Sequence, residues 1–294
     1  MSASDSEAWR GFDRVRLDRE YDARGTVDDI WPILARYRRL TDEAKAALPC
    51  ETGVPYGPSE PERLDIYRVP GADRPVPVFV FVHGGYWRLL DAADSGFMAP
   101  LITAEGVMVV TVNYALLPNV ELAETVRQCR AALAWVHANI ARYGGDPARI
   151  HVGGNSAGGH LGAMLAADSW QDGSGLPRDA VRSATLISGL YDLEPLRHCH
   201  VNEWARLTAE SAAANSPLRR LPRPDLPVLL SYAPSDTGEF KRQTALYRAA
   251  LECQGNPTGF VEVPGRNHFD IILGMTCRDD PLTRGILRLI RGSG

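Results

Sequence analysis

Short runs of apolar residues alternate with longer amphipathic stretches over most of the chain. Residues 64–67 alternate apolar with polar side chains, and residues 76–82 form a nearly continuous β-branched and aromatic run. The first pattern predicts an edge strand and the second a strand buried on both faces. Further apolar runs predict strands at residues 107–112, 150–152, 184–188, 227–232 and 259–263.

Helical periodicity fills the intervals between these runs. The predicted helices cover residues 122–143, 157–167, 239–254 and 281–291. Strand and helix therefore alternate along the chain. This alternation predicts an α/β fold in which right-handed crossovers build a mostly parallel sheet with helices on both faces. At this length the chain fits a single domain of residues 1–294 around one sheet.

Two stretches lie outside the alternation. Residues 1 to about 60 form a polar N-terminal extension, whose helical spacing begins behind a predicted cap at Thr26. We expect this extension to pack over the sheet or over the mouth of the site. Between the strands ending at Ser188 and beginning at Pro227, the connection is too long for a compact fold. A small helical insertion near the site is predicted there, over about residues 192–225.

The composition narrows the classes of function. With 32 basic and 36 acidic residues the formal net charge is −4, which argues against a nucleic-acid partner. Five widely spaced cysteines favour reduced thiols and a cytoplasmic location. The N-terminus has neither the basic nor the apolar region of an export signal, and no run approaches 18 apolar residues. No membrane partner is therefore expected.

Residues 154–158, Gly-Asn-Ser-Ala-Gly, match the G-x-S-x-G pattern of a nucleophile elbow. They lie between a predicted strand and a predicted helix, the context that such an elbow requires. Gly154 and Gly158 would leave room for the sharp turn, and Ser156 would be the nucleophile. The N–H of Ala157, at the helix N-terminus, would face a developing oxyanion. The alternative is a glycine-rich helix start with a capping serine.

A second glycine motif, His83-Gly84-Gly85-Tyr86-Trp87, follows directly on the buried strand of residues 76–82. This is the position at which α/β hydrolases carry an oxyanion loop. Backbone N–H groups approach a carbonyl oxygen closely where side chains are absent, so Gly84 and Gly85 are the predicted donors beside Ala157. His83 is predicted to fix the loop by hydrogen bonding to the backbone.

A serine hydroxyl needs a base, and in this fold the acid and the histidine follow the serine in the chain. His268 is the predicted base because it lies in a loop after the last strand. The acid has two candidates, Asp236 and Asp192, each in a loop after a predicted strand. Asp236 is favoured because the loop after a late strand is the usual origin of the group that orients the imidazole.

A metal site is not predicted. His198-Cys199-His200 carries ligand atoms at a spacing of two residues, but the sequence offers no second ligand cluster. Two surface histidines in the insertion explain the pattern more simply. No cofactor is expected, because serine chemistry with backbone oxyanion donors needs none.

Together these motifs resemble the serine-dependent kynurenine formamidase (arylformamidase) branch of the α/β hydrolases. The resemblance spans about residues 15–290 and also includes residues 188–193, 235–243 and 267–270. Tyr86-Trp87 after the glycines, and Glu-Phe-x-Arg-Gln after Asp236, distinguish that branch from generic esterases. Asn155 stands where family members often have histidine. The resemblance implies a triad of Ser156, Asp236 and His268.

The activity implied by this resemblance is hydrolysis of an aryl formamide such as N-formylkynurenine through an acyl-enzyme. A carboxylesterase or amidase with the same triad is the first alternative, and a non-catalytic binding protein of the same fold is the second. The expected partner is a small aromatic amide or ester. A homodimer is one assembly that the sequence leaves open. Tyr86, Trp87 and Trp204 are the predicted substrate contacts.

Overall fold

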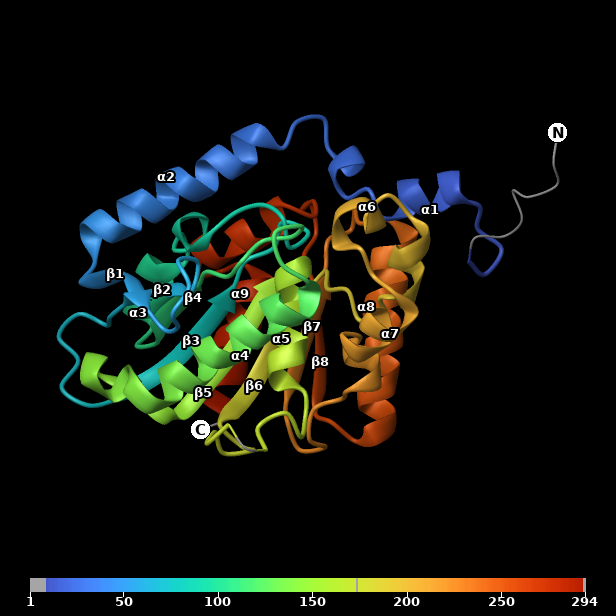
Figure 1. Ribbon diagram of the computed structural model, residues 1–294. Helices are drawn as coiled ribbons and strands as arrows, with labels where there is room; N and C mark the ends of the chain where they lie inside the picture. The colour runs from blue at the N-terminus through green and yellow to red at the C-terminus, as the bar shows by residue number, and fades with distance from the viewer. Residues whose placement is uncertain (1–8, 173, 293–294) are drawn as a thin grey trace, which may run out of the picture.

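The computed structural model describes residues 9–172 and 174–292. Its centre is one sheet with helices packed against both faces (Figure 1). The strands are β1 (Cys50–Pro55), β2 (Arg63–Tyr67), β3 (Val76–Val82), β4 (Met108–Val112), β5 (Gly145–Asn155), β6 (Val181–Ile187), β7 (Val228–Tyr232) and β8 (Thr258–Glu262). Their order across the sheet is β1-β2-β4-β3-β5-β6-β7-β8. All neighbouring pairs from β4 to β8 are parallel, whereas β1–β2 and β2–β4 are antiparallel.

The helices divide between the two faces of the sheet, and alternate residues of β3 show the division. The helices are α1 (Arg14–Glu20), α2 (Trp31–Ala47), α3 (Ala99–Ala104), α4 (Leu122–Asn139), α5 (Ala157–Ala166), α6 (Asn202–Ala205), α7 (Ala209–Ala214), α8 (Gly238–Gln254) and α9 (Pro281–Gly292). Val78 and Val80 belong to the apolar cluster that includes α4, α5 and α8. Phe79 and Phe81 belong to the cluster that includes α2, α3 and α9. Because side chains alternate along a strand, both faces of β3 are buried.

The predicted edge position of residues 64–67 is wrong. These residues form β2, which lies between β1 and β4, and β1 is the edge strand. The sequence of β1, Cys-Glu-Thr-Gly-Val-Pro, is polar and carries both glycine and proline. Such a composition hides a strand from apolar-pattern analysis, and it is typical of an edge that has solvent on one side.

The predicted helix cap at Thr26 is also wrong. Thr26 ends a single 3-10 turn, Arg24–Thr26, and its hydroxyl donates to the carbonyl of Ala23. Helix α2 begins five residues later at Trp31, with proline in its first turn. The carboxylate of Asp29 accepts a 3.0 Å hydrogen bond from the Trp31 N–H there. Proline at the start of the helix fixes the boundary that the apolar spacing alone placed too early.

Short helices fill the long connection between β6 and β7. They are the 3-10 helix η4 (Glu194–His198), α6, α7 and the 3-10 turn η5 (Pro217–Arg219). Residues 1–8 of the predicted N-terminal extension lie outside the described residues. Within residues 9–172 and 174–292, no helix has the length and apolar character needed to cross a membrane.

Candidate active site

Ser156 occupies the sharp turn that joins β5 to α5. Its backbone has φ 58° and ψ −121°, a conformation that costs energy for any residue with a side chain. A Cβ on Gly158 would lie 2.1 Å from the carbonyl oxygen of Val82, and one on Gly154 would lie 2.3 Å from the carbonyl oxygen of Gly158. Both glycines of the motif are therefore required by close backbone approach. The N–H of Ser156 donates to Ile187 on the neighbouring strand at 2.8 Å, which holds the turn.

His268 and Asp236 are in direct contact. Nδ1 of His268 lies 2.6 Å from Oδ1 of Asp236, and both side chains are buried. The other carboxylate oxygen accepts hydrogen bonds from the Ser188 hydroxyl at 2.6 Å and from the Ala233 N–H at 2.9 Å. Burial alone would raise the pKa of Asp236, but the His268 ring and these hydrogen bonds hold that pKa below its ordinary value. Asp236 is therefore ionised at neutral pH and fixes the Nδ1–H tautomer of His268.

The second nitrogen of His268 is free to act on another group. Nε2 is buried, and no partner for it lies within the described part of the chain. His268 and Ser156 line the same cavity. The Phe240 ring packs on the imidazole with 4.7 Å between ring centroids and restricts its position. This arrangement leaves one imidazole nitrogen available beside the serine.

The glycine loop after β3 lies against Ser156. A Cβ on Gly84 would be 3.4 Å from the Cβ of Ser156, so the loop backbone and the serine are neighbours. Gly85 has φ +92°, and a Cβ there would lie 2.3 Å from the carbonyl oxygen of Leu89. Ala157 is the first residue of α5, and the N–H groups in the first turn of a helix have no acceptor within the helix. The backbones of Gly84 and Ala157 are therefore next to Ser156, and Gly85 lines the same cavity.

His83 contacts the backbone of the glycine loop that follows β3. Its Nδ1 lies 3.0 Å from the carbonyl oxygen of Gly84, and the Tyr114 ring stacks on the imidazole with 4.1 Å between centroids. The Tyr114 hydroxyl donates to the His83 carbonyl at 2.8 Å. Burial lowers the pKa of His83 to about 4, so the ring is neutral at pH 7. These contacts agree with a structural role.

The cavity beside Ser156 has a volume of about 590 Å³. Its wall is largely aromatic and apolar, with a few charged groups. Residues from α1, α2 and the turn between them supply one side. The sequence predicted that this extension packs over the sheet or the mouth of the site, but it did not identify these residues. That side consists of Asp18, Arg19, Asp22, Ala23, Arg24, Ile30, Trp31, Leu34 and Tyr37. The N-terminal segment therefore forms part of the site itself.

Two of the three predicted substrate contacts line this cavity. Tyr86 and Trp204 are part of its wall, with 5.9 Å between their ring centroids. The Trp204 Nε1–H donates to the Tyr86 carbonyl, and the Tyr86 hydroxyl donates to the Tyr21 carbonyl. The prediction that Trp87 contacts the substrate is wrong, because Trp87 is fully buried and its Nε1–H donates to Nδ1 of His160. Its ring faces α5 rather than the cavity.

Asp192, the alternative acid, makes no contact with His268. Its carboxylate accepts from the Glu194 N–H in the next turn. Sequence reasoning missed Ser188 and Phe240, which orient the Asp236–His268 pair. The sequence placed Ser188 at the end of a predicted strand, whereas in the structure it directly follows β6. Only the structure shows its positive φ of 46° and its hydroxyl against Asp236.

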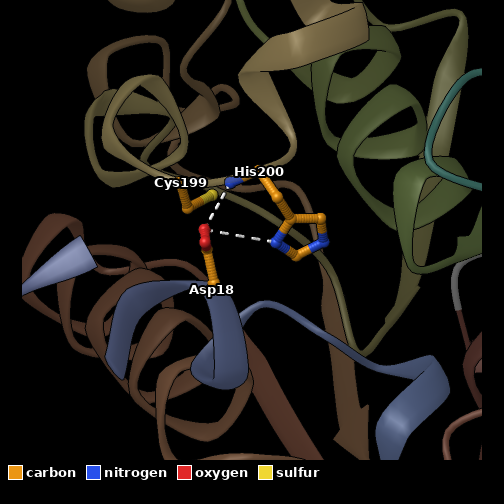
Figure 2. Close-up of side chains that lie close together, drawn as sticks. All are labelled: Asp18, Cys199 and His200. Atoms are coloured by element: carbon orange, nitrogen blue, oxygen red, sulfur yellow. Dashed lines mark hydrogen bonds and ion pairs between the residues drawn. The ribbon is translucent and has the colours of Figure 1, made fainter. Parts of the chain in front are cut away.

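One group of side chains has the composition of a metal site. The ligand atoms of Asp18, Cys199 and His200 lie within 4.8 Å of one another, so α1 supplies the partner that the insertion lacked in the sequence (Figure 2). However, the Asp18 carboxylate already accepts from the His200 N–H at 2.5 Å and from the Arg14 guanidinium at 2.8 Å. Burial also raises the pKa of the Cys199 thiol to about 12. These contacts favour a role in which the group links α1 to the insertion through hydrogen bonds and ion pairs over a role in binding a cation.

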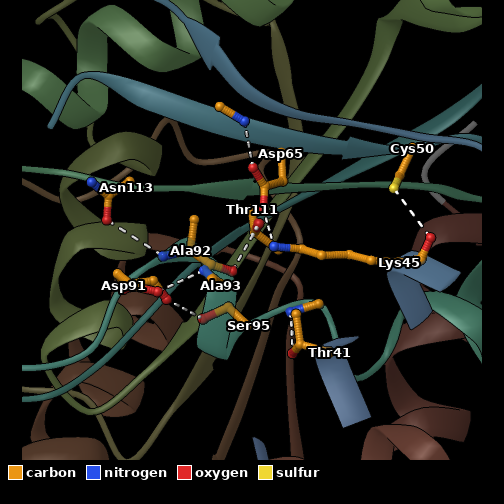
Figure 3. A network of polar contacts seen from close by, with 12 residues as sticks. Thr41, Lys45, Cys50, Asp65, Asp91, Ala92, Ala93, Ser95, Thr111 and Asn113 are labelled. Carbon is orange, nitrogen blue, oxygen red and sulfur yellow. Dashed lines mark hydrogen bonds and ion pairs between the residues drawn. The ribbon is translucent and has the colours of Figure 1, made fainter. Parts of the chain in front are cut away.

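A second set of contacts holds α2 to the sheet (Figure 3). Lys45 forms a 3.0 Å ion pair with the buried Asp65 of β2, whose carboxylate also accepts from the Gly53 N–H of β1. The Thr41 hydroxyl accepts from the Gly96 N–H at 3.0 Å. The N-terminal segment is therefore fixed at α1 by the insertion and at α2 by the sheet, with the cavity wall between.

Known proteins are similar to this chain over nearly its whole length. The kynurenine formamidase of Salmo salar is 31% identical over 294 residues, covering 96% of this chain and 98% of the relative. The family model BD-FAE matches residues 64–184. A solved structure from Silicibacter sp. TM1040 has a TM-score of 0.79 at 24% identity, covering 94% of this chain and 98% of that chain. A Pyrobaculum calidifontis esterase has a TM-score of 0.69 at 21% identity, covering 91% and 93%. The α/β-hydrolase fold predicted from the sequence is confirmed.

Proposed function

Because the chain belongs to the kynurenine formamidase family of α/β hydrolases, we propose that it hydrolyses aryl formamides, such as N-formylkynurenine, by serine catalysis. The observation that carries this proposal is the His268–Asp236 contact of 2.6 Å, with the free Nε2 of His268 in the same cavity as Ser156. A buried carboxylate, an oriented imidazole and a serine on a strained turn are the parts that acyl transfer needs.

The first half of the reaction forms a formyl-enzyme. The Ser156 hydroxyl attacks the formyl carbon while Nε2 of His268 takes its proton. The carbonyl oxygen becomes an oxyanion that accepts hydrogen bonds from the N–H groups of Gly84, Gly85 and Ala157. The Asp236 carboxylate stabilises the imidazolium. The C–N bond then breaks, and His268 returns the proton to the departing arylamine nitrogen.

The second half releases formate. A water molecule replaces the arylamine, gives a proton to Nε2 of His268 and attacks the formyl carbon of the ester. The same backbone donors stabilise the second oxyanion. Collapse of this intermediate breaks the bond to the serine oxygen, which recovers its proton from His268. Each turnover consumes one water and requires no redox partner.

A carboxylesterase or amidase activity is the second candidate. The cavity of about 590 Å³, with its aromatic wall, has room for aryl groups that differ in size. The same triad would then serve a larger acyl group. A substrate series that varies the acyl group on one aryl leaving group separates the two candidates.

The test of the serine mechanism combines labelling with substitution. An aryl organophosphonate is expected to label the wild-type chain at Ser156 and to stop hydrolysis of formanilide. Ser156→Ala should prevent the labelling and lower kcat until it is at most roughly ten-thousandfold above the uncatalysed rate. The melting temperature should stay near that of wild type. Near-normal turnover by Ser156→Ala would contradict the mechanism.

We also propose a cytoplasmic location, which the free thiols of all five cysteines support. A small aromatic amide or ester is the proposed ligand, and a homodimer is one assembly state to be tested. Mass photometry or sedimentation would determine the assembly.

A further inference from the structure

The side chain of Asn155 is a buried amide that lacks a partner. Asn155 ends β5, directly precedes Ser156, lines the cavity and is 6% exposed. Among residues 9–172 and 174–292, nothing accepts a hydrogen bond from its Nδ2. Buried polar groups in native proteins nearly always have a partner, so a donor that lacks one on a residue lining a cavity is a candidate to bind a molecule in that cavity.

Reversing the amide does not remove the orphaned donor. Within the described residues, neither side-chain atom of Asn155 takes part in a protein hydrogen bond, so exchanging oxygen for nitrogen leaves a donor without an acceptor. The backbone of Asn155 does have a place in the sheet, since it pairs with Ile187 of β6. The side chain is therefore held at the cavity by a fixed strand end and is not needed to hold that strand.

The position of the amide limits what it can bind. A Cβ on Gly84 would lie 3.6 Å from Oδ1 of Asn155 and 3.4 Å from the Cβ of Ser156, so the amide, the serine and the glycine loop share one corner. Three backbone N–H groups already serve the scissile carbonyl oxygen in the proposed mechanism. Preorganised donors stabilise such an oxyanion, and the proposed mechanism already assigns three to it. The amide is left for an acceptor on the leaving group, close to the scissile bond.

We propose that Asn155 Nδ2 donates a hydrogen bond to a carbonyl oxygen that lies ortho to the scissile group on the aryl ring of the substrate. Asn155 thus determines specificity for ortho-acyl aryl substrates, an inference that rests on the proposed hydrolase function. The ring fixes an ortho carbonyl on the carbon next to the one that bears the scissile nitrogen. A rigid acceptor at that place reaches a donor beside the nucleophile, whereas a para carbonyl points away from it.

The experiment compares two isomeric substrates, 2-acetylformanilide and 4-acetylformanilide. They contain the same atoms and release arylamines of similar basicity, so they differ in the place of the carbonyl. The measured quantity is the ratio of kcat/KM for the ortho isomer to kcat/KM for the para isomer. Using a ratio cancels any general effect of a substitution on catalysis or on the fraction of folded protein.

The test variant is Asn155→Leu, which keeps the size of the side chain and removes the donor. Asn155→Ala is a second variant in case the leucine disturbs the turn. Each is expected to lower the ortho-to-para ratio roughly tenfold or more, because only the ortho isomer loses the hydrogen bond from the Asn155 amide. The matched control is Gln171→Leu, which removes another buried amide with an unsatisfied atom that does not line the cavity. It should leave the ratio within twofold of wild type.

The outcomes separate this inference from the proposed function. Equal losses on both isomers would overturn the inference, because they would place Asn155 at the oxyanion or in the fold. If the wild-type enzyme cleaves neither formanilide, the formamidase proposal is wrong, and the same ratio is measured on 2-acetylphenyl and 4-acetylphenyl acetate. A selective loss on the ortho ester would still support the inference, and an unchanged ratio would overturn it.

Discussion

The hydroxyl of Ser188 donates a 2.6 Å hydrogen bond to Oδ2 of Asp236, on the carboxylate whose Oδ1 contacts His268. The N–H of Ala233 donates to the same Oδ2 at 2.9 Å. Each oxygen therefore has its own partners, and the plane of the carboxylate is fixed. This fixes in turn the direction in which Nε2 of His268 faces.

The first prediction follows from those partners. In Asp236→Asn, the backbone N–H of Ala233 requires an oxygen opposite it, so the amide NH₂ must turn toward His268. Nδ1 of His268 would then accept a hydrogen bond, and the proton would move to Nε2, where it blocks the base. We expect kcat to fall on the order of ten-thousandfold. Asp192→Asn is the control and should cost far less, because Asp192 caps a nearby turn. Steady-state kinetics of both variants would make the comparison, and the reverse ranking would assign the acid to Asp192.

The second prediction concerns pH and a histidine outside the reaction. His160 is fully buried, accepts from Trp87 through Nδ1, and lies 2.7 Å from the Asn215 carbonyl through Nε2. Burial lowers its pKa to about 4, and protonating Nδ1 would set it against the Trp87 donor. The unfolded chain, with a histidine pKa of about 6.5, binds the proton first. The contribution of neutral His160 to the free energy of unfolding is therefore at its maximum above about pH 6.5, and it decreases as the pH drops toward 4.

Urea denaturation at several pH values measures this dependence. His160→Gln lacks the titrating ring, so its stability should fall less steeply over the same pH window, even though the variant is less stable at pH 7. Buried His83 and His151 also have pKa values lowered to about 4 and would account for a remaining slope. An identical slope in wild type and variant would contradict the assignment to His160.

The third prediction concerns the size of the acyl group. The Tyr86 ring is held by its hydroxyl against the Tyr21 carbonyl and by edge contact with Trp204, so it forms a rigid wall. If that wall closes the acyl side, each added methylene costs about 1–3 kcal/mol through overpacking. We expect kcat/KM to fall steeply from formyl to acetyl to butyryl on one aryl leaving group. Equal rates for butyryl and formyl substrates would identify a general esterase.

The fourth prediction concerns metal ions. Serine chemistry with backbone donors needs no metal, so dialysis against EDTA should leave kcat unchanged. Added zinc should not raise it. The Asp18–Cys199–His200 group offers a specific check, because Cys199→Ser weakens any metal affinity there while keeping the size of the side chain. Loss of activity to EDTA with recovery in zinc would show that a metal takes part.

Local motifs with strict steric demands were readable from the sequence. Residues 154–158 must include glycines because their Cβ atoms would collide with backbone, and that demand is written in five consecutive residues. The order of serine, acid and histidine then located Asp236 and His268 in loops after strands. In each case the physical requirement involves neighbours in the chain or a fixed topological order.

Features set by distant contacts were not readable. Tyr86 and Trp87 are adjacent aromatics in one motif, and both have positive φ, yet one lines the cavity and the other packs under α5. Which ring faces inward depends on His160, more than seventy residues away in the chain. The contribution of Trp31 and Tyr37 to the cavity wall depends in the same way on how α2 lies over the sheet.

The cavity wall formed by α1 and α2 gives the molecule two parts with separate constraints. In the proposed mechanism, the nucleophile, the base and the oxyanion donors come from strand ends and the loops beside them, where a small displacement would end turnover. The opposite wall comes from one terminal segment that enters the sheet only through β1, at the edge. Changes in that segment can reshape the space offered to a substrate without moving a reacting atom. Selectivity in this scaffold can therefore diverge by exchange of one contiguous stretch of chain, which makes the segment a natural unit for building chimeras between relatives.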